Sequence, residues 1–144
     1  MSTPHIRSIG FTCRDAEALA SFYTTHLGCR RQECLEIEAG SYAELIGLPG
    51  SRLKLLRLQL GAEQLELLEV LELGPGLRPG RSIPADSRSN DLWFQHICVV
   101  VSDMAAAAGP IQTLIQQGQL QSISSAPQTL PSWNQAAAGI QAFK

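Results

Sequence analysis

Two stretches of this 144-residue chain follow the same pattern, and such an internal repeat constrains the fold more strongly than any single residue does. The first reads SIGFTCRD and runs from Ser8 to Asp15, and the second reads HICVVVSD and runs from His96 to Asp103. In each stretch a polar residue opens an apolar, strand-like run, an Asp follows, and a helical pattern that ends at a Gly comes next. We therefore predict one strand–helix unit that is used twice.

The first helical pattern has signals at both ends. Asp15 is a typical N-cap, apolar residues recur at helical spacing from Ala16 to Leu27, and Gly28 is a typical C-terminal stop. The residues that follow predict three strands, a short helical turn and a hairpin connection at Gly61-Ala62. The strands are expected near 29–38, 52–60 and 63–71, and the helical turn near 42–46. The first unit is thus predicted to be βαβββ.

The second unit is expected after a linker rich in Gly and Pro that covers residues 72–92. A strand is predicted over 93–102, and Asp103 should cap a second helix that Gly118 ends, with Gly109-Pro110 kinking it or delaying its start. Further strand-like runs lie near 120–125 and from Gly139 to Lys144. This unit lacks a counterpart of the strand at 63–71, so either the natural polypeptide continues past Lys144 or another subunit covers the free sheet edge.

Composition argues against several classes of function. A hydrophobic fraction of 44%, a charged fraction of 17% and a net charge of -2 are ordinary for a globular protein and disfavour nucleic acid as a partner. The sequence shows no signal peptide and no apolar run near the ~20 residues of a membrane span, so we expect a cytoplasmic protein without membrane association. The four cysteines form no CxxC pair and are expected to be reduced, with Cys13 and Cys98 packed inside strands.

The order of these elements resembles the vicinal oxygen chelate superfamily, which includes glyoxalase I, bleomycin-resistance proteins and extradiol dioxygenases. The resemblance spans nearly the whole chain and is carried, besides the opening phrase, by Phe22-Tyr23, Leu27-Gly28, the LELLE run from Leu65 to Glu69, and Phe94-Gln95-His96. It implies an α+β fold: a single glyoxalase-like domain, residues 1–144, in which two βαβββ units (1–71 and 93–144) form a half-open barrel around a cavity. The second unit would be incomplete at its C-terminus.

The resemblance also implies a site for a divalent metal such as Zn, Ni, Fe or Mn. The family's ligand positions correspond here to Ser8, Glu66, His96 and a fourth residue that would lie past Lys144. Glu66 and His96 are good ligands, and the resemblance gives Glu66 the further role of catalytic base. A Ser hydroxyl is a poor ligand for these metals, so we predict an incomplete site that holds no stoichiometric transition metal.

Other residues bear on the site without being metal ligands. Ser8, Phe94 and Cys98 are predicted to contact a small organic ligand, because sites in this family are apolar with a few placed polar groups. Glu66 lies between two leucines, and an unpaired carboxylate is costly to bury, so it either lines a wet cavity or pairs with a cation. An exposed or salt-bridged Glu66 and a His96 that merely packs in the core remain the simpler readings.

Three kinds of function stay open at this point. The first is a protein of the glyoxalase, bleomycin-resistance and dioxygenase type that handles a small organic molecule; as an enzyme it would be a metal-dependent lyase, isomerase or dioxygenase. The second is a metal-free binding or sequestering protein, expected to be a homodimer. The third is an interaction domain without a ligand.

Overall fold

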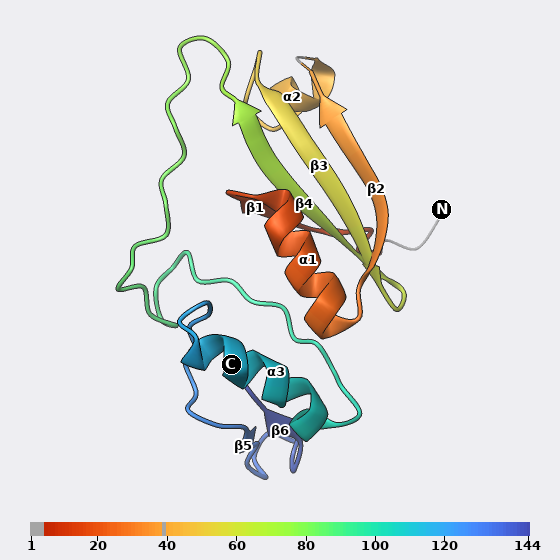
Figure 1. The fold of residues 1–144 in the computed structure, drawn as a ribbon, viewed down its shortest axis with the longest axis vertical. Coiled ribbons are helices and arrows are strands. Elements are labelled where there is room, and N and C mark those ends of the chain that lie inside the picture. The colour runs from red at the N-terminus through yellow and green to blue at the C-terminus, as the bar shows by residue number, and fades with distance from the viewer. Residues whose placement is uncertain (1–4, 39) are drawn as a thin grey trace. The chain divides into compact units, whose positions relative to one another are not determined.

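A four-stranded mixed sheet forms the centre of the first of two units into which the chain divides, Met1–Ser82 and Ile83–Lys144. The computed structural model describes residues 5–38 and 40–144. The sheet has the order β1-β4-β3-β2, in which β1 runs parallel to β4 and the other neighbours are antiparallel (Figure 1). Its strands are β1 (Ile9–Cys13), β2 (Arg30–Ile37), β3 (Arg52–Leu60) and β4 (Glu63–Glu72). The predicted βαβββ order of the first unit is confirmed.

Helix α1 (Ala16–Leu27) begins and ends where its sequence signals place it. The Asp15 carboxylate accepts a hydrogen bond from the Ala18 N–H at 2.9 Å, and Gly28 takes the left-handed conformation (φ 71°) that glycine adopts without strain. A second carboxylate supports the same end, because Glu69 of β4 accepts from the Ala16 N–H at 3.0 Å. Negative charge at a helix N-terminus is favourable, so the hydrogen bond to Glu69 stabilises the packing of α1 on the sheet.

The contact with Glu69 identifies the face of the sheet that α1 covers. Side chains alternate between the two faces of a strand, so Leu65 and Leu67 lie on the same face as Glu69, and their partners across the ladder are Leu58 and Leu56. All four leucines are buried, with Leu56, Leu58 and Leu67 fully excluded from solvent. This leucine layer beneath α1 is the main core of the first unit. The opposite face carries Glu66 and is left for the candidate site.

Opposite charges fix the register of the β3–β4 hairpin. Three cations of β3 stand directly opposite three glutamates of β4, and each pair is also an ion pair: Arg52 with Glu72, Lys54 with Glu69, and Arg57 with Glu66. A slip of one residue would separate these pairs and move every leucine to the wrong face. The two-residue connection at Gly61-Ala62, with Gly61 at φ 59°, sets the same register from the turn.

A close backbone contact holds the end of β4 against the loop that precedes β3. The buried Ser51 hydroxyl accepts a hydrogen bond from the Gly74 N–H at 2.9 Å. A Cβ atom on Gly74 would lie 1.9 Å from the Pro49 carbonyl oxygen, so no residue but glycine fits this crossing. The short helix α2 (Ser41–Leu45) lies before this loop and beside the open face of the sheet.

The second unit contains helix α3 (Met104–Gln116) and a two-stranded antiparallel ladder of β5 (Gln128–Thr129) and β6 (Gln141–Ala142). As predicted, the Asp103 carboxylate caps α3 by accepting from the Ala106 N–H, and Gly118 turns the chain out of the helix at φ 71°. The helix starts directly after Asp103 with Pro110 in its interior, so Gly109-Pro110 does not delay its start. Among the described residues, no helix combines the length and hydrophobicity needed to cross a membrane.

The strands predicted at 93–102 and 120–125 are wrong. In the first unit, the matching phrase forms β1 because β4 supplies a parallel partner along its whole length. No described residues of the second unit form such a partner, and a strand whose N–H and C=O groups lack a neighbour is not held extended. The 120–125 segment instead donates two backbone hydrogen bonds, from Ile123 and Ser124, to the Lys144 carbonyl. The final run is reduced to Gln141–Ala142.

Candidate functional site

Glu66 occupies the face of β4 that α1 does not cover. Its position follows from the same alternation that buries Leu65 and Leu67 beneath the helix. Its side chain is 22% exposed, so the carboxylate is shielded from solvent without being fully buried. A group of this kind needs polar partners, and the structure provides one at each oxygen.

The hydroxyl of Ser8 donates to Oε2 of Glu66 at 3.1 Å, and the guanidinium of Arg57 donates through Nε to Oε1 at 2.8 Å. Ser8 immediately precedes β1, whose Gly10 lies opposite Glu66 in the parallel ladder. The family resemblance matches Ser8 and Glu66 to ligand positions of one site, and in the structure their side chains are in direct contact. Glu66 therefore pairs with a cation, which is one of the two alternatives considered for a carboxylate between leucines and agrees with the simpler interpretation of a salt-bridged glutamate.

Arg57 extends this polar row across the sheet. Its Nη1 atom donates to Oε2 of Glu33 on β2 at 2.5 Å, while its Nε is engaged by Glu66. The two carboxylates, Glu66 foremost, raise the pKa of Arg57 through these hydrogen bonds and their charge, so the guanidinium stays cationic. Four side chains thus form a continuous chain, Ser8–Glu66–Arg57–Glu33, which runs from the start of β1 through β4 and β3 to β2.

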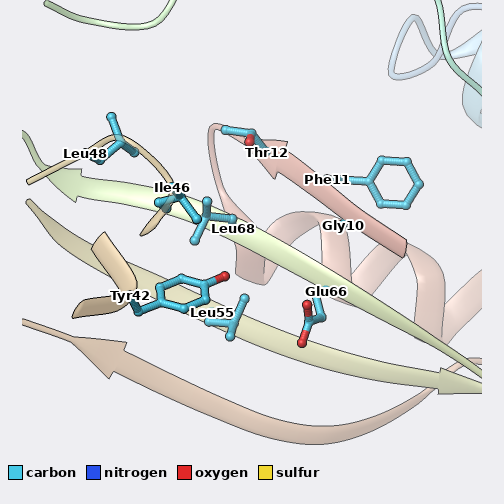
Figure 2. Close-up of a pocket in the computed structure, with 9 residues that line it drawn as sticks. All are labelled: Gly10, Phe11, Thr12, Tyr42, Ile46, Leu48, Leu55, Glu66 and Leu68. Atoms are coloured by element: carbon cyan, nitrogen blue, oxygen red, sulfur yellow. The ribbon is translucent and has the colours of Figure 1, made fainter. Parts of the chain in front are cut away.

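A pocket of about 310 Å³ opens next to this row (Figure 2). In Figure 2, Leu55 lies between the Tyr42 ring and the Glu66 carboxylate, and Leu68 lies beside Ile46, while the Phe11 ring points away from the other labelled side chains. The remaining wall comes from Gly10, Thr12, Ile46 and Leu48. The volume lies at the small end of the range for organic ligands, and an apolar wall with few polar groups is the usual composition of such sites.

The other predicted site residues, Phe94, His96 and Cys98, lie in the second unit. His96 and Cys98 are exposed, and Phe94 is half-buried, with the Lys144 ammonium 4.8 Å from its ring centre. Cys98 was expected inside a strand and is instead an exposed thiol, because the 93–102 segment has no strand partner among the described residues. Cys13 and Cys29 are shielded from solvent, and burial raises the pKa of both thiols.

Two site residues were missed from the sequence, Arg57 and Tyr42. The signal for Arg57 was present, since a two-residue turn at Gly61-Ala62 pairs Leu60 with Glu63 and, counting back, Arg57 with Glu66. Counting residues from a turn in the same way does not predict the position of Tyr42. Its place beside the pocket depends on how α2 folds back over the sheet, which strand register does not determine.

The metal implied by the family resemblance does not fit the donors found around Glu66. Within the first unit the matched positions offer one carboxylate and one hydroxyl, and both oxygens of that carboxylate already accept from Ser8 or Arg57. A guanidinium at 2.8 Å repels a divalent cation from the same oxygen. No three His, Cys, Asp or Glu side chains group into a potential metal site in the described parts of the chain.

Comparison with known proteins identifies a solved structure with a similar fold. No family model and no curated protein matches this sequence. The structure is similar to a glyoxalase family protein from Bacillus cereus, with a TM-score of 0.70 and 14% identity over 90% of this chain and 82% of that one. A second solved structure, of the protein SMU.1112c, covers 99% of this chain and 100% of its own at 13% identity, but its TM-score of 0.47 is too low to support an argument. The chain therefore has a fold like that of this glyoxalase family protein, as the order of its elements predicts.

Proposed function

We propose that this protein binds a small organic molecule in the pocket of its first unit, as a metal-free binding or sequestering protein. The observation that carries the proposal is the state of Glu66: the residue matched to a family metal ligand lines the pocket while Ser8 and Arg57 occupy its two oxygens. The apolar wall of Leu55, Leu68 and the Tyr42 ring supplies the contact area that a small organic ligand needs.

Arg57 binds one oxygen of Glu66, the residue that the family resemblance matches to a metal ligand. It supplies positive charge to Glu66, but a guanidinium is not a Lewis acid and cannot coordinate the oxygens of a substrate as a metal ion does. In the proposed function Glu66 acts as a fixed hydrogen-bond acceptor rather than as a metal-bound base. The predictions of a homodimer and of a contribution from His96 remain predictions alongside this proposal.

The proposal is tested by metal analysis together with ligand binding in the presence of a chelator. The purified full chain should contain far less than one equivalent of transition metal, and a fragment molecule that binds the pocket should show the same dissociation constant with and without EDTA. Amide chemical shifts of Thr12 and Leu68 report whether the bound molecule lies in the pocket. About one tightly held metal per chain, or binding that disappears with EDTA, would overturn the proposal.

A second test asks whether Arg57 is what opposes metal binding. The Ser8→His variant alone should gain little zinc affinity, because Arg57 still holds Oε1 of Glu66. Ser8→His combined with Arg57→Met frees that oxygen and adds an imidazole, so its zinc affinity should exceed that of the single variant by about ten-fold or more. Isothermal titration with zinc measures both. Equal affinities for the single and double variants would contradict the role given to Arg57.

A further inference from the structure

The pocket wall carries one formally charged side chain among its described residues, and that side chain is the Glu66 carboxylate. The other polar wall groups are the hydroxyls of Thr12 and Tyr42, which are neutral. No arginine or lysine lines the pocket, so an anionic ligand would meet a carboxylate with no cation in the wall to offset it.

The ion pair behind the wall compensates the charge of Glu66 only in part. Glu33 and Glu66 share a single guanidinium, that of Arg57, so the cluster keeps one surplus negative charge. Arg57 directs Nε to Glu66 and Nη1 to Glu33, which commits these two donors to protein carboxylates. Both Glu66 and Arg57 are less than one-third exposed, so this charge is only partly screened by solvent.

Glu66 also retains hydrogen-bonding capacity. Each carboxylate oxygen has room for about two donors, and Oε1 and Oε2 each receive one protein side-chain donor, from Arg57 and Ser8. The remaining capacity is acceptor only. A ligand atom that approaches Glu66 therefore has to donate, and an ionised donor gives the stronger, charge-assisted bond.

We infer that the ligand is an organic amine, whose ammonium group donates to Glu66 and whose apolar body lies against Leu55, Leu68 and the Tyr42 ring. This inference rests on the proposed function, since it specifies the class of molecule that the same pocket takes. A molecule of this class fits the cavity of about 310 Å³ when its apolar body is a single ring or a short branched chain.

Three probes of nearly equal shape test the charge preference: 2-phenylethylamine, 2-phenylethanol and phenylacetate. Titrations of the full chain at pH 7, followed by NMR at the pocket amides, should give the amine an affinity about ten-fold above that of the alcohol, with phenylacetate weakest. Glu66→Gln should remove the advantage of the amine. Glu63→Gln makes the same charge change on the same strand but on the face that α1 covers, and should leave it intact.

A second variant, which leaves the ion pairs intact, keeps the inference testable if Glu66→Gln does not fold. Thr12 is exposed on β1 and lines the pocket, so Thr12→Lys adds a cation beside Glu66 without removing a described hydrogen bond. It should lower the affinity of the amine about ten-fold and raise that of phenylacetate. Failure of all three probes to bind the pocket counts against the proposed function. Pocket binding with phenylacetate equal to or tighter than the amine, or an amine preference unchanged in Glu66→Gln, overturns this inference alone.

Discussion

Replacing Arg57 by methionine removes the cation that joins Glu33 to Glu66 while keeping much of the apolar stem of the side chain. The pair with Glu66 joins side chains that are 28% and 22% exposed at 2.8 Å, so we assign it about 1 kcal/mol of stability. Glu33 is 45% exposed, and solvent screening limits its pair with Arg57 to about 0.5 kcal/mol. Arg57→Met should therefore lower the free energy of unfolding by about 1.5 kcal/mol, as measured by urea denaturation followed by circular dichroism.

A double-mutant cycle isolates the Arg57–Glu66 term. The variants Arg57→Met, Glu66→Gln and their combination should give a coupling energy of about 1 kcal/mol, which falls as salt is added. Arg52 and Glu72 are the matched control, because they face each other on the same two strands but are 41% and 74% exposed and 3.8 Å apart. Their coupling should be no more than a few tenths of a kcal/mol. Equal coupling in the two cycles would refute the view that partial burial gives the Glu66 pair its strength.

Two further predictions concern packing and thiol reactivity. Gly74→Ala should lower the free energy of unfolding by about 3 kcal/mol, because the new Cβ would clash with the Pro49 carbonyl. In the control variant Gly80→Ala the new Cβ meets no atom within 4 Å, so the free energy of unfolding should change by less than about 0.5 kcal/mol. Urea denaturation of both variants measures the difference. Cys29 is buried, which raises its pKa, whereas Cys34 is exposed. Iodoacetamide at pH 8 should therefore modify Cys34 at least about ten times faster than Cys29, as measured by peptide mass mapping of the labelled protein. Similar rates would contradict the burial of Cys29.

Sequence reasoning predicted the first unit well because its signals are local. Asp15 and Gly28 set the limits of α1 through caps that depend on neighbouring residues, and the Gly61-Ala62 turn ties β3 to β4 at short range. The assignment of Ser8 and Glu66 to one site came from the family resemblance, whereas their hydrogen bond is seen only in the structure. Arg57 was missed because the hairpin was recognised without its register being counted through to the residue opposite Glu66.

The second unit was predicted less well because its strands depend on pairing partners, which the composition of a single segment does not reveal. The 93–102 run has the composition of a strand, with valines at 99, 100 and 101, yet strand formation also needs a neighbour to accept and donate backbone hydrogen bonds. Propensity describes the segment alone and not its partner. Asp103 and Gly118, whose effects are local, were read correctly, whereas the pairing-dependent strands were not.

The parallel pairing of β1 with β4 has a consequence for how the chain acquires its pocket. Strand β1 has its ladder partner far along the sequence, with Leu65 opposite Ile9, whereas the β3–β4 hairpin closes across two residues. Closing the longer loop costs more chain entropy, so the hairpin should form early and β1 should add to its edge late in folding. Gly10 and Thr12 belong to β1, which joins the sheet last. The wall of the pocket is therefore complete only when folding of the unit is nearly finished.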